Sequence, residues 1–143
     1  PPGRRVLALT PSGRQLDQPL VEELAAEPAL TILSSRFEGF DERILDRLVT
    51  DRVSIGPYVL SGGEIPALAI VDAIARKLPG ALGSEESGVE ESFSAELGRG
   101  LEYPHYTRPA EYRGWTVPDV LLSGDHARIA SWRRERSAER SAA

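Results

Sequence analysis

A glycine-rich stretch near the middle of the chain carries the residues best suited to binding a ligand. Residues 54–64 read S-I-G-P-Y-V-L-S-G-G-E, where apolar residues typical of strands run into two adjacent glycines. A helical pattern then extends from Ile65 to Leu78, with Pro66 in the first turn, where its missing N–H costs nothing. Glycines before a helix leave free N–H groups that can receive an anion or the polar edge of a ligand. The alternative interpretation is a tight turn without a ligand.

A second candidate is the run P-H-Y-T-R-P at residues 104–109. Its rings offer stacking surfaces and its polar groups offer hydrogen-bond donors, which is chemistry used to recognise single-stranded RNA. The sequence after it predicts a helix from His126 to about Arg140, with Ile129 and Trp132 inward and arginines outward. Together the loop and the basic helix could contact phosphates. Otherwise the loop is a proline-fixed surface segment and the helix face is simply solvated.

The elements that would position these residues alternate between strand and helix. Apolar runs predict strands at residues 5–9, 30–34 and 51–55. Periodic segments predict helices at residues 18–26, from an N-cap at Asp41 to about Leu48, and at 65–78. In the first two of these helices the apolar residues expected to face inward are Leu20, Val21, Leu24, Ile44, Leu45 and Leu48. This order indicates an α/β fold with a mainly parallel sheet.

Polar turns follow each of the three predicted strands. They occupy residues 10–13, 35–39 and 56–63. Ligands of parallel sheets gather at the carboxyl ends of the strands, so we expect the three turns to converge on one binding site.

The chain changes character after residue 80. Residues 83–100 are acidic, small and glycine-containing, which predicts a flexible linker. Residues 117–122 are interpreted as a short extended piece. The predicted organisation is a ligand-binding domain at residues 1–82, the linker at 83–100 and a helical unit at 101–143.

Composition excludes several classes of protein. A chain of 143 residues can bury one core with a small appendage. Its net charge of −5 gives no global electrostatic argument for nucleic acid, although arginines crowd the C-terminal end. The absence of cysteine excludes disulfides and thiolate metal sites, and suits a cytoplasmic protein. No apolar run reaches the ~20 residues of a membrane helix, so no membrane partner is expected.

Four motifs in order carry a resemblance to a known family. They are R-F-E-G-F-D-E-R (36–43), S-I-G-P-Y-V-L-S-G-G-E-I-P-A (54–67), P-H-Y-T-R-P (104–109) and V-P-D-V-L-L-S-G-D-H (117–126). Together they resemble the bacterial tRNA (guanine-N1-)-methyltransferases, which modify the guanosine 3′ of the anticodon, over residues 6–136. The resemblance implies a SPOUT-class α/β domain with a trefoil knot and a helical C-terminal domain that grips tRNA. It also implies a homodimer with active sites at the subunit interface, and S-adenosylmethionine as methyl donor.

The resemblance assigns the donor pocket to the three turns. The residues expected to line it are Leu9, Thr10, Pro11, Ser35, Phe37, Glu38, Gly39, Ile55, Gly56, Pro57, Tyr58, Val59, Leu60, Gly62, Gly63 and Pro66. Backbone amides and carbonyls can read adenine edges where glycine allows close approach. Glu38 resembles an acidic residue that lies near the donor and a magnesium ion, and its alternative is an ordinary loop carboxylate.

Methyl transfer to guanine N1 requires a carboxylate to remove the N1 proton and a cation to stabilise the charge developing on the base. Arg76 resembles the catalytic arginine of the family. Glu91, in E-E-S-F, stands where relatives carry aspartate, so its carboxylate is displaced by about 1.5 Å unless the linker compensates. Its alternative is a solvated linker acid. Glu102 matches a second acidic position, for the substrate or magnesium, and the further substrate-binding residues expected are His105, Tyr106, Arg108 and Arg133.

Two departures leave alternatives open. The family extends beyond both ends of this chain, which predicts an internal fragment with exposed strand edges and little activity of its own. A non-catalytic or degenerate knotted RNA-binding module is the rival hypothesis, favoured by Glu91 in place of aspartate and opposed by Arg76, Tyr58 and S-G-G-E. A methyltransferase acting on another RNA position is a third, which P-H-Y-T-R-P opposes.

Overall fold

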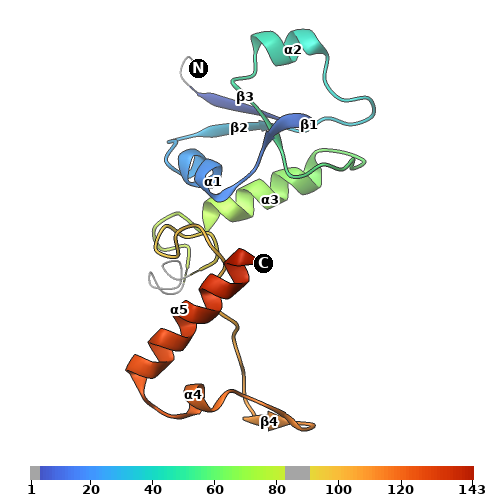
Figure 1. The fold of residues 1–143 in the computed structure, drawn as a ribbon. Coiled ribbons are helices and arrows are strands. Elements are labelled where there is room, and N and C mark those ends of the chain that lie inside the picture. The colour runs from blue at the N-terminus through green and yellow to red at the C-terminus, as the bar shows by residue number, and fades with distance from the viewer. Residues whose placement is uncertain (1–3, 83–90) are drawn as a thin grey trace. The chain divides into compact units, whose positions relative to one another are not determined.

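The computed structural model describes residues 4–82 and 91–143, and Figure 1 shows their helices and strands. The chain divides into two compact units, Pro1–Gly83 and Ser84–Ala143, which are described separately. The first eight residues of the predicted linker, 83–90, lie outside the described residues. In the part of the chain that is described, no helix combines the length and the apolar character needed to cross a membrane.

A three-stranded parallel sheet forms the centre of the first unit. Its strands are β1 (Arg5–Gln15), β2 (Leu30–Leu33) and β3 (Asp51–Ser54), in the order β2-β1-β3. Leu7 of β1 is paired with Ile32 on one side and with Asp51 on the other. The prediction of an α/β unit with a parallel sheet is therefore confirmed.

The turn predicted at residues 10–13 is wrong, because β1 continues through it. Both Leu9 and Arg14 are partners of Val53 in β3, so the residues between them form an irregularity within the strand. Pro11 has no N–H to give to the ladder, which favours such a break. A Cβ on Gly13 would lie 2.5 Å from the carbonyl carbon of Arg52, so only glycine lets the chain return to β3 here.

Helices α1 (Gln18–Ala25) and α3 (Glu64–Ala75) cover one face of the sheet, and α2 (Glu42–Arg47) lies on its other side (Figure 1). Asp17 caps α1 by accepting a hydrogen bond from the N–H of Leu20 at 2.9 Å. The core cluster consists of Leu7, Leu9, Leu20, Leu24, Val53 and Ile70. Leu20, Val21 and Leu24 are all buried, as their periodicity predicts.

The other two helices contribute less to the core than their sequences suggest. Asp41 caps α2 as predicted, but only Leu45 is buried, whereas Ile44 and Leu48 are exposed. The helix ends at Arg47, so Leu48 is its C-cap and no longer follows the helical period. Helix α3 buries Ile70 completely, yet Ile65, Leu68 and Val71 are exposed by 61%, 65% and 52%. Helix α3 is therefore apolar on two sides, and only one of them is covered within this unit.

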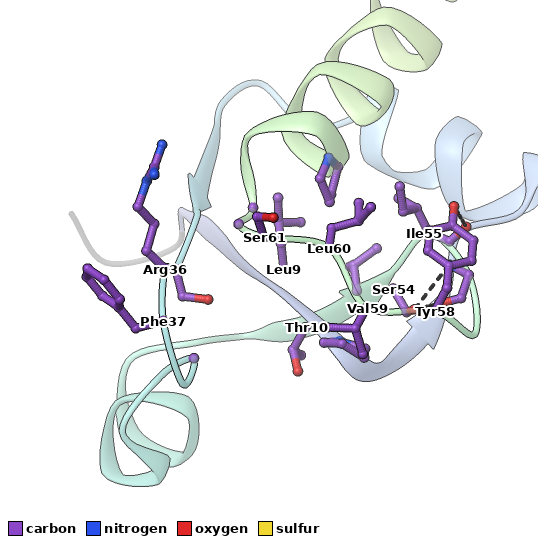
Figure 2. Close-up of a pocket in the computed structure, with 18 of the residues that line it drawn as sticks. Leu9, Thr10, Arg36, Phe37, Ser54, Ile55, Tyr58, Val59, Leu60 and Ser61 are labelled. Atoms are coloured by element: carbon purple, nitrogen blue, oxygen red, sulfur yellow. Dashed lines mark hydrogen bonds between the residues drawn. The ribbon is translucent and has the colours of Figure 1, made fainter.

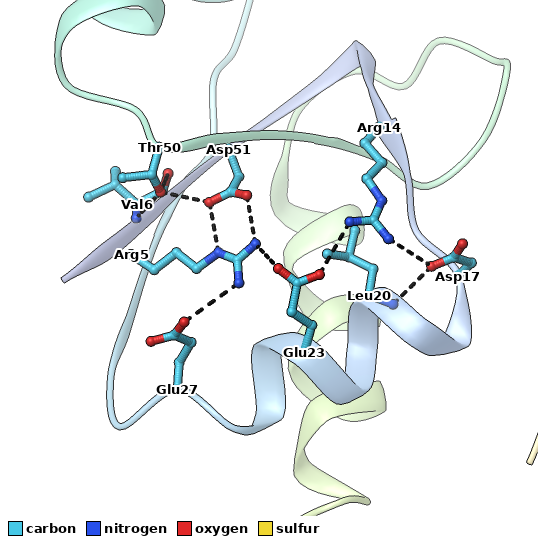
Figure 3. Close-up of polar contacts among 9 residues, drawn as sticks. All are labelled: Arg5, Val6, Arg14, Asp17, Leu20, Glu23, Glu27, Thr50 and Asp51. Atoms are coloured by element: carbon cyan, nitrogen blue, oxygen red, sulfur yellow. Dashed lines mark hydrogen bonds and ion pairs between the residues drawn. The ribbon is translucent and has the colours of Figure 1, made fainter. Parts of the chain in front are cut away.

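A polar network ties β1, β3 and α1 together (Figure 3). The guanidinium of Arg5 donates to both carboxylate oxygens of Asp51, at 2.8 and 2.7 Å, and to Glu23 at 2.6 Å. The bond to Asp51 first, and then the bond to Glu23, raises the pKa of Arg5. The bonds from Arg5 in turn lower the pKa of Asp51. Arg14 pairs with the same Glu23 and with Asp17, the N-cap of α1.

The described part of the second unit, residues 91–143, contains a hairpin and two helices. Strands β4 (Glu111–Tyr112) and β5 (Trp115–Thr116) form an antiparallel pair that the sequence analysis missed. Helix α4 (Asp119–Leu122) replaces the extended piece predicted there, because the N–H of Leu121 bonds to the carbonyl of Pro118 and starts a turn. Helix α5 (His126–Ala142) begins at His126, as predicted, with Asp125 as its N-cap.

Turns and hydrogen bonds order the segment between residues 91 and 102. The N–H of Phe93 donates to the carbonyl of Gly100 at 2.7 Å, across a series of turns. Ser137 of α5 donates to the carbonyl of Leu101 at 2.6 Å, and Ser141 accepts from the N–H of Leu101 at 2.8 Å. Two serine hydroxyls of helix α5 therefore hold the backbone at Leu101, shortly before the loop at residues 104–109.

Candidate active site

A cavity of about 280 Å³ lies where the segments following β2 and β3 meet the irregular middle of β1. Its lining residues are Leu9, Thr10, Pro11, residues 35–39, 53–56 and 58–63, and Pro66. Figure 2 shows Phe37 and Tyr58 at opposite ends of this group. The three polar segments predicted to converge therefore do so around one cavity.

Every residue predicted to line a donor pocket lies on this cavity except Pro57. Arg36, Ser54 and Ser61 were covered only as members of the stretches 35–39 and 54–64, and Val53 was missed. Val53 and Ser54 are the last two residues of a buried strand. Nothing in the sequence there distinguishes a residue that faces the core from one that lines the cavity.

Backbone hydrogen bonds join the loop after β2 to the glycine loop, residues 56–63. The N–H of Gly63 donates to the carbonyl of Ser35 at 3.0 Å, and the hydroxyl of Ser34 donates to the carbonyl of Gly63 at 3.1 Å. Arg36 and Gly62 form an isolated antiparallel bridge. A Cβ on Gly63 would lie 2.7 Å from the Cα of Ser34, so this glycine serves close approach of two backbones.

An ion pair reinforces the same junction. The guanidinium of Arg36 donates through Nε to Oε1 of Glu64 at 2.8 Å, and its Nη2 lies 2.7 Å from that oxygen. The pKa of Glu64 is lowered, first by its own backbone N–H and then by Arg36. Because Gly63 offers no capping side chain, the Glu64 carboxylate supplies the acceptor at the start of α3.

A compact turn forms the other wall of the cavity. The buried hydroxyl of Ser54 donates to the carbonyl of Gly56 at 3.0 Å, and the N–H of Tyr58 bonds to the same carbonyl at 2.9 Å. The Tyr58 hydroxyl reaches the carbonyl of Ile55 at 3.3 Å. A Cβ on Gly56 would collide with the Tyr58 ring, so the glycine lets that ring fold back over the turn.

The open rim carries side chains suited to a ligand. Phe37 is fully exposed and has a positive φ of 58°, a conformation that is costly for a residue with a Cβ. Glu38 follows it and is exposed, and Gly39 completes the turn at a φ of 98°. An aromatic ring and a carboxylate are thus exposed at the edge of the cavity.

The predicted catalytic pair is divided between the units. Arg76 is the C-cap of α3, and its N–H donates to the carbonyl of Asp72 at 3.1 Å. Glu91 belongs to the second unit and is partly buried. Neither unit holds both residues, so the pair stays a prediction.

A second cavity, of about 690 Å³, lies in the second unit. Its lining residues are residues 103–110, Val117, Leu121, Leu122, Ile129 and Arg133. His105, Tyr106, Arg108 and Arg133 are thus brought together, and Oε2 of Glu102 lies 3.2 Å from Nε2 of His105. The guanidinium of Arg133 lies 4.6 Å from the centre of the Tyr103 ring. The sequence analysis missed Tyr103 and the apolar residues from α4 and α5.

Within residues 4–82 and 91–143, no three His, Cys, Asp or Glu side chains gather as metal ligands would. Glu38 belongs to the first unit and Glu102 to the second. The magnesium site that the resemblance implies is therefore not formed by these residues within either unit.

Comparison with known proteins gives consistent matches. The family model described as tRNA (Guanine-1)-methyltransferase TrmD matches residues 2–143. Proteins named tRNA (guanine-N(1)-)-methyltransferase are similar to the chain. That of Exiguobacterium sibiricum is 56% identical over 96% of this chain and 55% of its own length. Those of Brevibacillus brevis and Nitrobacter winogradskyi are 55% and 57% identical, over 97% and 94% of this chain and 56% and 55% of their own lengths.

The chain thus spans about half the length of the curated relatives it matches. Within that half the similarity includes both cavities and all four motifs. The chain belongs to the tRNA (guanine-1)-methyltransferase family.

Proposed function

We propose that this chain provides the donor pocket and an RNA-contacting unit of a tRNA methyltransferase. The enzyme transfers a methyl group from S-adenosylmethionine to guanine N1. The guanosine that it modifies lies 3′ of the anticodon. The observation that carries the proposal is the convergence of three loops, from separate parts of the chain, on one cavity. The names of the relatives support the reaction and the substrate class.

The cavity fits the chemistry of the donor. Glycine-rich backbone at residues 58–63 offers amides and carbonyls to an adenine edge, and Leu60 and Pro66 offer apolar contact to its ring. The exposed Glu38 carboxylate is placed at the rim, where an amino group of the donor can pair with it. When bound, S-adenosylmethionine supplies an electrophilic methyl group on a sulfonium.

Glu91 and Arg76 are proposed to act on the guanine. The Glu91 carboxylate accepts the proton from N1, which leaves a lone pair in the plane of the ring to receive the methyl group. The negative charge that develops on the base is stabilised by hydrogen bonds from the Arg76 guanidinium.

We propose a homodimer in which a second copy covers the uncovered side of α3. That side exposes Ile65, Leu68 and Val71, and the same helix carries Pro66 on the wall of the donor cavity. Apolar residues grouped in this way mark interaction surfaces. We also propose that the backbone around the glycine loop forms the trefoil knot of the SPOUT class. The proposed compartment is the cytoplasm, where tRNA is modified.

The second unit is proposed to contact the RNA. Its cavity combines His105, Tyr106 and Arg133, and α5 presents further arginines at positions 128, 134 and 140. Rings and cations of this kind bind unpaired bases and phosphates.

The first test is calorimetric titration of this chain with S-adenosylmethionine, together with its mass in solution. We expect saturable binding by a dimer, and no binding would contradict the donor site as built from this chain. The next test is turnover of Glu91→Gln in a protein of the length of its relatives. A loss of about 10²- to 10⁴-fold is expected for removal of a general base. Donor binding without any methylation of tRNA by the protein of that length would instead support a non-catalytic RNA-binding module.

A further inference from the structure

The hairpin of β4 and β5 exposes two aromatic rings that no part of the donor or guanine chemistry uses. Tyr112 and Trp115 are directly paired across the strands, and their ring centres are 6.2 Å apart. Their exposed fractions are 54% and 72%. Tryptophan is highly buried on average, so a ring exposed to this extent beside another ring is unusual.

The hairpin holds these rings on a short and defined backbone. Only Arg113 and Gly114 separate the two strands, and both have positive φ, at 54° and 82°. Such two-residue turns match the twist of the flanking strands. The N–H of Val117 bonds to the carbonyl of Ala110 at 2.9 Å and extends the ladder by one step. The ring pair is thus positioned before any partner arrives.

A cation completes the cluster. The guanidinium of Arg113 lies 5.3 Å from the centre of the Tyr112 ring, and Trp115 is the more exposed of the two rings. A flat ring with an arginine beside it offers a stacking surface for a base and a charge for the adjoining phosphate. An apolar protein partner would be matched poorly by the cation and by the neighbouring Glu111.

We propose that Trp115, supported by Tyr112 and Arg113, is a stacking site for an unpaired nucleobase of the RNA substrate, separate from the guanine that is methylated. This inference rests on the proposed RNA substrate, because methylation at N1 requires a base freed from pairing and therefore a loop whose neighbouring bases are accessible. Tyr112, Arg113 and Trp115 do not line the second cavity, although Ala110 and Val117 at the base of the hairpin do.

The first experiment uses the fluorescence of Trp115. The chain has two tryptophans, so Trp132→Phe leaves Trp115 as the single reporter. This variant is titrated with an RNA hairpin that has an unpaired loop and, separately, with a fully paired RNA duplex of equal length. We expect saturable quenching with the loop RNA and little with the duplex, since only unpaired bases can stack on the ring. An unchanged Trp115 spectrum at saturating loop RNA would overturn the proposal.

The second experiment measures affinity for the loop RNA. Trp115→Ala is expected to weaken binding by about fivefold to 150-fold, the usual range for loss of one base–aromatic stack. Trp115→Phe keeps a flat ring and should retain most of the affinity, whereas Trp115→Leu keeps apolar bulk and should not. Thr116→Val on the same strand is the matched control and should bind like the unaltered chain. Equal affinity of the Ala and Phe variants would contradict stacking.

The outcome separates this proposal from the proposed function. Donor binding and tRNA methylation could be found while the fluorescence of Trp115 does not change with loop RNA and its variants bind RNA normally. In that case only the stacking site is overturned. If quenching and the Ala–Phe difference are found but a protein of the length of the relatives does not methylate tRNA, the stacking site stands and the catalytic proposal fails.

Discussion

The two units differ in what holds them together. The first is built around buried strands, with Leu7, Ala8 and Leu24 fully buried and loops joined through backbone atoms. Among the described residues of the second unit, only the small side chains of Ser94 and Ser137 are buried, and contacts between rings and arginines take the place of an apolar core. Substitutions in the first unit should therefore change stability through packing and backbone contacts. Substitutions in the second unit should act through the loss of single surface side chains.

The sharpest test of this comparison is a pair of substitutions on α3. Ile70→Ala removes a fully buried side chain and should lower the free energy of unfolding by about 3 kcal/mol. Leu68→Ala, on the exposed side of the same helix, should change it by less than about 0.5 kcal/mol in the monomer. Urea denaturation at low protein concentration measures both. Equal losses would show that the two sides of α3 are covered alike.

Gly13→Ala tests the backbone packing at the irregularity of β1. The added Cβ would meet the backbone of Arg52, which cannot move aside as a side chain can, so we expect a loss of about 2 kcal/mol. Gly39→Ala is the contrasting variant, because nothing lies near its Cβ and only the strain of a positive φ remains. Thermal unfolding of both variants is the measurement, and a milder effect at Gly13 than at Gly39 would count against close approach.

Asp51→Asn tests the polar network of the first unit. Its carboxyl pKa is lower in the folded chain than in the unfolded one, chiefly because of the Arg5 hydrogen bonds. The stability from this pair is therefore complete above the ordinary aspartate pKa near 4 and is lost as pH falls through the lowered pKa. The variant should lose about 1 kcal/mol at pH 7, allowing for solvent screening, and show a flatter dependence on pH. Denaturation midpoints of the unaltered chain and of Asp51→Asn, measured between pH 3 and pH 7, test this prediction.

Arg133→Ala should give the smallest effect. Its guanidinium stacks on Tyr103 at an exposed site, where such a contact contributes about 0.5 kcal/mol. We expect little change in the unfolding of the chain but a clear loss of RNA affinity, measured by titration with loop RNA. A large loss of stability would mean that the ring contacts act as a core after all.

The sequence predicted the parallel sheet because its strands are continuous apolar runs, and it predicted the cavity because polar residues follow those runs. It did not predict the shape of β1, since the return to β3 at Gly13 depends on a neighbouring strand distant in sequence. The Arg36–Glu64 pair is likewise a long-range contact with no local signal. The hairpin was missed because each strand has only two residues, too short for alternation to be visible.

The prediction of an extended segment where α4 forms was wrong for a different reason. Val120, Leu121 and Leu122 favour a strand by composition, but Pro118 and Asp119 are suited to the start of a helix, and this local start prevailed. The relation between Arg76 and Glu91 belongs to a third class, since the two residues lie in different units and no pattern within either unit fixes their distance.

The two-sided helix α3 has a consequence for how the stability of the protein depends on its concentration. If a second copy covers the exposed side, folding and association share one equilibrium, and by mass action the melting temperature rises as the protein is concentrated. Dilution would then weaken the helix that carries Pro66 on the donor cavity, because part of its support comes from the other copy. Affinity for the donor would in this way respond to the abundance of the protein itself.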